Sequence, residues 1–401
     1  MLLKLRTLIS LLLLCIVAQA TAQTDTVEVA EQHVGDHLRV SLLTCGPGDE
    51  QVWEVFGHTA VRVIDSVHHT DEVFNYGTFE FGPDFEIQFM KGKLNYCVSV
   101  MSFHEFMEEY IQAKRSVEEQ ELLLDWKQKQ HICDFLYWNA EPENKYYKYD
   151  FFFDNCATRI RDIFPKPQVF GKEFRFGQAL PQGKRITFRD IINIYFYHDY
   201  WTRLGVNILL GSRIDKPMTN ADIMFLPDYL RDGVGGGTVS GHKIATSPVL
   251  ILPGGPASPG GVNWALLLTS TLAILTIAGL TVKKLRLLGK IMTTSLLLVT
   301  GLLGCLILVM WLATDHQGCR DNFNILWCLP TNIIVAFFNL KGKNKYALVA
   351  IFLVFISFVL HVCKVQGLLL PEFAPLLLAM VFIYGTIYRR TKKINTPISN
   401  A

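Results

Sequence analysis

The sequence predicts an α+β domain exported from the cytoplasm, followed by an all-α transmembrane domain of about five helices. Three observations support this organisation. Residues 1–22 combine a charged start with an apolar core. Residues 23–230 mix charges, turns and short apolar runs, as soluble domains do. Long apolar runs dominate residues 263–388 of the 401-residue chain, and they are typical of membrane helices.

Residues 1–22 are typical of a secretory signal peptide. Lys4 and Arg6 precede an apolar run at 8–17, and small residues up to Ala22 offer cleavage sites. The apolar run is short for a membrane span, which favours cleavage over the alternative of an uncleaved anchor helix. The domain that follows is therefore expected outside the cytoplasm.

The exported domain, residues 23–230, is expected to combine strands and helices. Alternating apolar and polar residues predict strands at 38–45, 58–65, 72–81 and 93–101. Helical spacing is found at 103–115, 117–140 and 155–164, and Pro165 ends the last of these. The stretch from there to residue 230 is expected to be helical and loop-like.

Residues 231–262 are rich in Gly, Pro and Ser, a composition typical of a linker. The apolar runs beyond it predict five transmembrane helices, at 263–282, 291–313, 325–340, 346–363 and 368–388. The loops at 283–290, 341–345 and 388–393 are basic, and such loops belong in the cytoplasm. This puts the 23–230 domain outside and the 389–401 tail inside, in agreement with the signal peptide.

Composition excludes some functions. The net charge of +2 and the lack of a basic face interleaved with aromatic residues argue against nucleic-acid binding. The exported domain contains Cys45, Cys97, Cys133 and Cys156, whose spacings fit no zinc site, so neither a metal nor another cofactor is expected. Export to an oxidising space allows a disulfide between two of the first three, but the sequence does not give its pairing.

Cys156 is the candidate nucleophile. It follows Asp154, a good N-cap residue, and would lie in the first turn of the 155–164 helix. Free backbone N–H groups there favour a thiolate, so the pKa of this thiol is expected to be lowered. The alternative is a buried structural cysteine, which is the commoner fate of the residue type.

His58 is the candidate base, because it begins a predicted strand directly after Gly57. A catalytic base needs an orienting group, and Asn75 or Tyr76 on the next strand could supply it. A cysteine at a helix start packed against a histidine on a strand is the papain-like arrangement. Here the histidine comes first in the chain, as in circularly permuted relatives of the NlpC/P60 group.

Substrate-contacting residues are expected on two surfaces. Asn155 adjoins the nucleophile, and Arg62 shares the strand face of His58 if the alternation holds. In the exported loop between two membrane helices, His316, Asn322 and Asn324 could bind a headgroup or an acceptor amine. The alternatives are a surface charge for Arg62 and an ordinary interfacial loop.

Five segments together resemble the Bacteroidetes-type apolipoprotein N-acyltransferase family, Lnb. They are LLTCGPGDEQVWEVFGHTAVRVID, FNYGTFEFGPDFEIQFMKGKLNYCVS, YDFFFDNCATRIRDI, MFLPDYL and, in the membrane half, TDHQGCRDNFNILWCLPTN. The resemblance covers nearly the whole chain, and it is the set of segments that is specific. It implies a bacterial inner-membrane protein whose catalytic domain lies in the periplasm.

The resemblance also implies a reaction. Cys156 would take an acyl chain from a membrane phospholipid as a thioester, with His58 as base. It would then pass the chain to the α-amine of the lipid-modified N-terminal cysteine of a diacylated apolipoprotein, with ping-pong kinetics. One alternative is a membrane-anchored periplasmic cysteine hydrolase, such as a peptidoglycan amidase or peptidase. A second is a receptor or transporter-like protein whose exported domain only binds.

Overall fold

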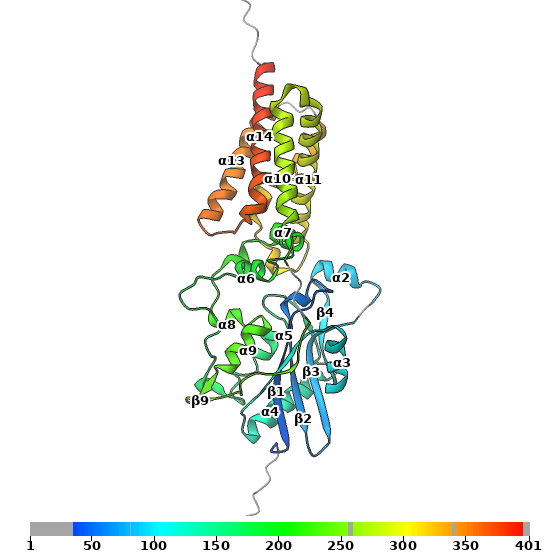
Figure 1. Cartoon of the computed structure of the whole chain (residues 1–401), viewed down its shortest axis with the longest axis vertical. Helices are drawn as coiled ribbons and strands as arrows, with labels where there is room; N and C mark the ends of the chain where they lie inside the picture. Colours follow the sequence, from blue (N-terminus) through cyan, green and yellow to red (C-terminus); the bar gives the residue numbers. More distant parts are fainter. Residues whose placement is uncertain (1–34, 81, 256–259, 339–341, 396–401) are drawn as a thin grey trace, which may run out of the picture.

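The computed structural model describes residues 35–80, 82–255, 260–338 and 342–395. The expected signal peptide, residues 1–22, lies outside the described residues. The chain forms an α+β domain and a bundle of long helices, stacked end to end along the long axis of the molecule (Figure 1). The predicted fold class is therefore confirmed.

The α+β domain is built on an antiparallel sheet. In the described part of the chain this sheet has seven strands, in the order β10-β5-β1-β2-β3-β4-β6. Strands β1 to β4 pair antiparallel with their neighbours in sequence, and only β2 and β3 are joined by a short turn. The strands are β1 Leu38–Cys45, β2 His58–Asp65, β3 Thr70–Phe79, β4 Asn95–Ser102, β5 Val117–Glu121, β6 Tyr146–Lys148 and β10 Val249–Leu252.

Helices cover both faces of the sheet. The larger core lies between one face and α4, α5 and α9, whereas α3 covers the other face over a smaller core. The helices of this domain are α2 Phe85–Lys91, α3 Phe103–Gln112, α4 Trp126–Ala140, α5 Cys156–Arg161, α6 Phe188–Tyr195, α7 Tyr200–Leu209, α8 Asn220–Ile223 and α9 Pro227–Gly235. Short 3-10 turns include η1 Glu54–Phe56, η2 Gly171–Glu173 and η3 Ser212–Asp215.

Two elements differ from the sequence prediction. Residues 117–121 form strand β5 instead of the start of a helix, because Val117 and Gln120 are buried against the sheet and α4 begins only after the Asp125 cap. The expected linker 231–262 contains the end of α9 and strand β10, whose apolar residues pair with the free edge of β5. It also supplies a hairpin, β8 Thr238–Val239 and β9 His242–Lys243, that joins β7 Phe174–Arg175.

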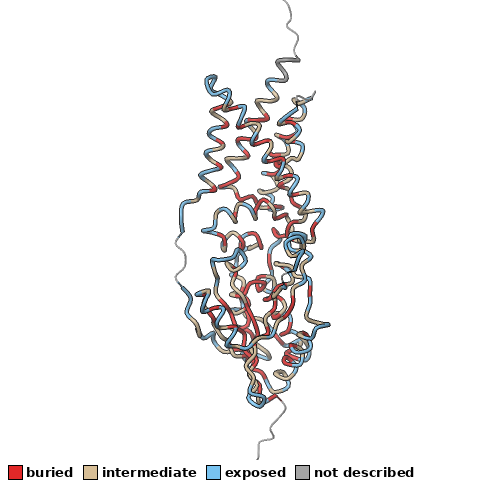
Figure 2. The backbone as a smooth tube through the Cα atoms, turned by 90° about the vertical axis from the view of Figure 1, so that its right-hand side faces the viewer, coloured by how far each residue is buried: buried red, intermediate tan, exposed pale blue. Residues whose placement is uncertain are grey.

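Among the described residues, four helices are long and apolar enough to cross a membrane. They are α10 Trp264–Thr281, α11 Arg286–Leu312 with the preceding turn η4 Lys283–Leu285, α13 Lys343–Val362 and α14 Leu370–Asn395. Their outward faces stay exposed although they are apolar, as a lipid-facing surface requires (Figure 2).

The third predicted segment, 325–340, is not one continuous helix. It contains the end of turn η6 Phe323–Leu326 and a short helix, α12 Asn332–Phe337, on either side of Pro330. This segment packs closely on α11, where a Cβ on Gly304 would lie 1.9 Å from the carbonyl oxygen of Cys328. Asn332 donates to Thr300 of α11 at 3.0 Å, which satisfies polar groups inside the bundle.

The loop between α11 and α12, with turn η5 Gln317–Cys319, ties the two parts of the molecule together. Asn322 and Asn324 are buried, and both donate to backbone carbonyls at the end of α7, at distances of 2.8 to 3.0 Å. Arg203 of α7 also pairs with the fully buried Glu372 at the start of α14. The α+β domain is thus attached to the end of the bundle at which α11 ends and α14 begins.

Candidate active site

Cys156 is the first residue of α5, the helix that packs against β2 and β3. The N-cap is Asn155, whose side chain accepts from the Thr158 N–H while the Thr158 hydroxyl accepts from the Asn155 N–H. The prediction of Asp154 as the cap is wrong, because this carboxylate forms a bidentate pair with Arg159 instead. The position of the thiol in the first turn is as expected.

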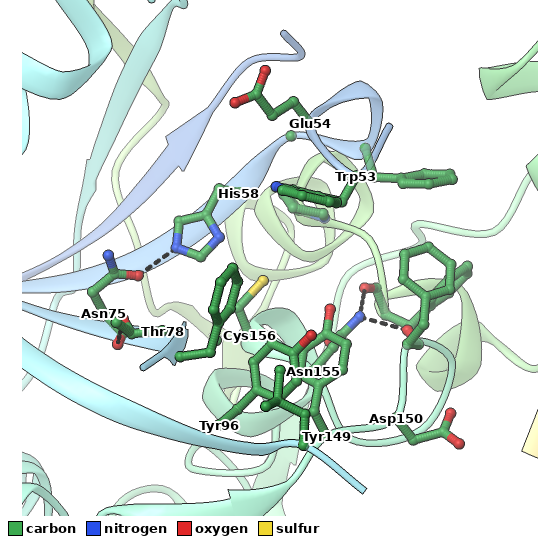
Figure 3. Close-up of a pocket in the computed structure, with 18 of the residues that line it drawn as sticks. Trp53, Glu54, His58, Asn75, Thr78, Tyr96, Tyr149, Asp150, Asn155 and Cys156 are labelled. Atoms are coloured by element: carbon green, nitrogen blue, oxygen red, sulfur yellow. Dashed lines mark hydrogen bonds between the residues drawn. The ribbon is translucent and has the colours of Figure 1, made fainter. Parts of the chain in front are cut away.

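His58 begins β2 at the same end of the sheet. The chain reaches it through Gly57, which has a φ of 74° and lies so close to β1 that a Cβ would be 2.6 Å from the Cys45 carbonyl oxygen. The His58 Nε2–H donates to Asn75 Oδ1 at 2.5 Å. The other ring nitrogen faces the side on which the Cys156 sulfur lies (Figure 3).

Gly77 provides the space between nucleophile and base. It lies at an irregularity in the pairing of β3 with β4 and has a φ of 91°. A Cβ placed there would be 3.8 Å from Cys156 Cβ and 4.0 Å from His58 Cε1. The side chains of Cys156 and His58 therefore both lie within 4.0 Å of the space that a side chain at position 77 would occupy.

Tyr76, the alternative orienting residue, lies on the opposite face of β3. Its hydroxyl donates to Asn139 of α4 at 2.8 Å in the larger core. Side chains alternate across a strand, so Asn75 and Tyr76 cannot both face His58. The structure brings Asn75 to the histidine and places Tyr76 away from it.

Burial controls the charges of this pair. It raises the pKa of the Cys156 thiol to about 11, although the backbone N–H groups of Thr59, Ala157 and Cys156 itself act in the opposite direction. Burial likewise lowers the pKa of His58 to about 4, against the effect of Asn75. The expected lowering of the pKa of the Cys156 thiol is therefore wrong. At neutral pH the resting pair is a neutral thiol beside a neutral imidazole.

Nucleophile and base open into a cavity of about 440 Å³ that is mostly apolar. Its lining comes from the sheet, from η1 and α2, from the segment before α5 and from the loop between α11 and α12. Aromatic residues dominate the wall: Trp53, Phe56, Phe79, Phe85, Phe89, Tyr96, Tyr110, Tyr149, Phe151 and Phe225. Such a lining suits a long apolar ligand better than a charged peptide.

The structure brings only some of the expected substrate contacts to this cavity. Asn155 and His316 line it, although the amide of Asn155 is already committed to capping α5 and to the carbonyls of Phe151 and Phe225. Asn322 and Asn324 do not line it, because they hold the loop to α7.

Arg62 is on the strand face of His58 as expected, but its guanidinium is occupied. It binds Asp71 at 2.6 and 2.7 Å and Glu119 at 3.1 and 3.2 Å, and it covers the ring of Phe103. Arg62 is not among the cavity-lining residues, so its position does not support substrate contact. Arg115, by contrast, lines the cavity, and its side chain donates to the Gly46 carbonyl oxygen at 2.9 Å.

Several lining residues were not singled out from the sequence. Trp53, Glu54 and Thr78 line the cavity beside the base, and α2 closes one side of it. The only sequence signal for α2 was the pair Phe85 and Phe89, spaced one helical turn apart in PDFEIQFMKGK.

The described cysteines are all free, so the disulfide considered from the sequence is not present among them. One group in the described chain has donor atoms within metal-binding distance of one another, namely His37, Asp65 and His68, within 4.8 Å. It lies at the far end of β2 from His58, and Asp65 there accepts from the backbone N–H groups of Val67 and His68 as a turn residue. This group takes no part in the cavity.

Comparison with protein families gives two matches. The model of the Lnb N-terminal periplasmic domain matches residues 25–191, and the model of the Lnb transmembrane domain matches residues 256–394. No curated protein and no solved structure is found to be similar. The two matches fall on the α+β domain and on the helical bundle, in the order expected from the resemblance. The chain therefore belongs to the Lnb family, with a periplasmic N-terminal domain and a multi-helix transmembrane domain.

Proposed function

We propose that this protein is a lipoprotein N-acyltransferase that carries the acyl chain on Cys156. Membership of the Lnb family implies lipoprotein N-acylation. The finer assignment is supported by the thiol of Cys156, the imidazole of His58 and an apolar cavity that opens beside both. The donor is a membrane phospholipid, and the acceptor is the α-amine of the lipid-modified N-terminal cysteine of a diacylated apolipoprotein.

In the first half-reaction the thiol of Cys156 attacks an ester carbonyl of the phospholipid. Its proton passes to the free ring nitrogen of His58 as the sulfur–carbon bond forms, so that no isolated thiolate is required. The backbone N–H groups that lie near the sulfur, those of Thr59 and Ala157, are suited to stabilise the oxyanion. Collapse of the intermediate releases the lysophospholipid alkoxide, which recovers the proton from His58.

In the second half-reaction the neutral α-amine attacks the thioester carbonyl. The nitrogen loses a proton to His58, the carbon–sulfur bond breaks, and the departing sulfur of Cys156 takes that proton back. The products are an amide on the lipoprotein and the original thiol. Asn75 acts in both steps as a positioning residue, since its carbonyl oxygen holds the proton on Nε2 and leaves the other nitrogen as the base.

The observation that carries the proposal is the aromatic cavity at the membrane end of the catalytic pair. His316 and Asp315, from the loop that follows a membrane helix, form part of its wall. A thioester must be protected from water until the amine arrives, and apolar walls together with a bound acyl chain exclude water. A peptidoglycan hydrolase would need an open polar groove instead, so the cavity favours transfer over the hydrolase alternative.

The proposal is tested with a reporter lipoprotein in cells that lack their own N-acyltransferase. We expect intact-mass spectrometry to show one additional acyl chain on the reporter when the native protein is expressed, and none with Cys156→Ser or His58→Ala. Cys133→Ser is the matched control, because Cys133 is buried in the same domain but does not line the cavity. A diacylated reporter in the presence of abundant native protein would contradict the proposal and favour the hydrolase.

A further inference from the structure

Helix α2 presents an apolar surface that the rest of the protein does not cover. None of its described residues, Phe85–Lys91, is buried. Ile87, Phe89 and Met90 are 46%, 44% and 60% exposed. Three large apolar side chains on a seven-residue helix form an unusual exposed patch for a soluble domain, and such patches mark sites of contact with membranes or other molecules.

The end of α2 is fastened to the membrane domain. The Asp315 N–H donates to the Lys91 carbonyl at 2.8 Å. His316 Nε2 lies 3.2 Å from the carbonyl oxygens of both Phe89 and Met90. Helix α11 ends at Leu312, three residues before Asp315, so the residue bonded to the end of α2 lies within about 11 Å of a membrane span.

This attachment places α2 beside the end of membrane helix α11, where the surface of a bilayer is expected. Figure 1 shows α2 at the end of the α+β domain that faces the helical bundle. Its exposed apolar side chains would then meet the boundary between headgroups and acyl chains, where interfacial helices bury their apolar faces. Lys91 and Lys93, both exposed at the end of α2, are suited to lipid phosphates at the same depth.

A continuous row of aromatic rings leads from this surface to the nucleophile. Adjacent ring centroids are 6.1, 5.3, 5.4 and 4.1 Å apart along the row Phe89, Phe85, Phe79, Tyr96 and Tyr149. All five rings line the cavity. Tyr149 ends the row beside Gly77, at 3.9 Å from the position where a Cβ would stand, next to the catalytic pair.

We propose that α2 lies in the outer leaflet of the inner membrane and forms the mouth through which one acyl chain of a phospholipid enters the aromatic cavity. Phe89 belongs both to the exposed surface and to the cavity wall, so the two environments are continuous at this residue. The lipid reaches Cys156 without passing through water. This inference rests on the proposed function for the identity of the ligand as an acyl donor.

The direct test uses a phospholipid with a photoreactive diazirine midway along one acyl chain, in liposomes that contain the purified Cys156→Ala protein. This variant cannot turn over, so binding is observed without the reaction. We expect covalent adducts on Phe85, Phe89 and Tyr96, located by peptide mass spectrometry. Val67 is the control position, because it is 55% exposed in the turn at the far end of β2 and should carry none. Adducts confined to the transmembrane helices would overturn the inference.

A kinetic test separates the mouth from the chemistry. The Ile87→Ser/Met90→Ser variant should raise the KM for phospholipid about tenfold or more, because apolar contacts with the bilayer are lost, and it should leave kcat unchanged. Val67→Ser is the matched exposed control and should change neither. An unchanged KM in the α2 variant would contradict the role of this helix. Failure of the native protein to acylate any lipoprotein, with the adducts on α2 still present, would refute the proposed function and leave lipid binding intact.

Discussion

The contact between His58 and Asn75 gives the sharpest test of the catalytic assignment. Asn75→Ala removes the acceptor for Nε2–H, which lies 2.5 Å away in the native protein. A buried hydrogen bond to a group that becomes charged contributes about 1.5–3 kcal/mol. Since about 1.4 kcal/mol corresponds to tenfold in rate, we expect kcat to fall by about 10- to 150-fold. The KM for phospholipid should change little, because Asn75 acts through His58.

Substituting a carboxylate at position 75 gives a second, independent prediction about the contact between His58 and Asn75. Asn75→Asp keeps an acceptor for Nε2–H but adds a negative charge beside the imidazole. Opposite charge favours the protonated ring, so the pKa of His58 should rise from about 4 and the acid limb of the rate profile should move to higher pH.

The kcat is measured as the rate of acyl transfer from phospholipid in liposomes to a diacylated peptide at a fixed pH. The pH profile is measured as single-turnover release of lysophospholipid without acceptor, so that protonation of the acceptor amine does not enter. Tyr76→Phe is the matched control, because Tyr76 neighbours Asn75 but bonds Asn139 on the other face of β3. It should reduce stability by about 1 kcal/mol and leave kcat unchanged. If Asn75→Ala were fully active, or if Tyr76→Phe were the slow variant, the assignment of Asn75 as the positioning residue would be refuted.

The remaining predictions concern charge and the junction between domains. Because the first half-reaction needs neutral His58 with a pKa of about 4, acylation of Cys156 measured without acceptor should persist as the pH falls to about 5 and be lost through pH 4, and a midpoint near 6.5 would contradict the burial argument. Alkylation of Cys156 by iodoacetamide in the absence of lipid should accelerate without a plateau up to pH 9, since the pKa of this thiol is about 11; a plateau near pH 7 would show a preformed thiolate. Arg62→Met should lower the free energy of unfolding by about 1–3 kcal/mol, because its ion pairs with Asp71 and Glu119 are lost, and the KM for phospholipid should stay unchanged. A raised KM would support the role in substrate binding that the sequence predicted for Arg62. Arg203→Met should destabilise the protein in detergent by about 3–5 kcal/mol because it leaves the buried Glu372 carboxylate with only the Asn263 amide and no opposite charge. The added Glu372→Gln change should recover part of that loss, and additive effects in thermal unfolding would refute the coupling.

The parts of the fold that the sequence predicted are those controlled by local patterns. The alternation of side chains in HTAVRVID marked β2 at its observed bounds, and the apolar runs marked the long helices of the bundle. The pairing of a helix-borne thiol with a strand-borne imidazole was also expected. The strand and the helices depend on residues that are close together in the chain, whereas the pairing of Cys156 with His58 was expected from the papain-like arrangement.

The parts that the sequence did not predict depend on tertiary contacts. The choice between Asn75 and Tyr76 requires the register of β2 against β3, in which Val61 pairs with Phe74, and no local pattern gives that register. The charged segment VEEQE became β5 because a partner strand was available on each side of it. The raised pKa of Cys156 follows from the depth of its burial, which a position at a helix start does not reveal.

The cavity was not predicted from the sequence either, because it too depends on tertiary contacts. Its lining is assembled from segments as far apart as η1, α2, the stretch before α5 and the loop after α11. The aromatic residues were visible in the sequence, but their convergence on one space was not. Three residues of the exported loop were predicted to contact substrate, and of these only His316 lines the cavity. Asn322 and Asn324 instead bond the end of α7 and hold the loop against it.

The central claim is that Cys156 carries the acyl chain between donor and acceptor. The most direct measurement is mass spectrometry of the purified protein after incubation with phospholipid liposomes and no acceptor. We predict one acyl group on the peptide that contains Cys156, labile to neutral hydroxylamine, formed with an equal amount of lysophospholipid and removed when a diacylated peptide is added. Cys156→Ala should acquire no acyl group. Release of free fatty acid without an acylated cysteine, or an acyl group on another residue that passes to the acceptor, would contradict the account.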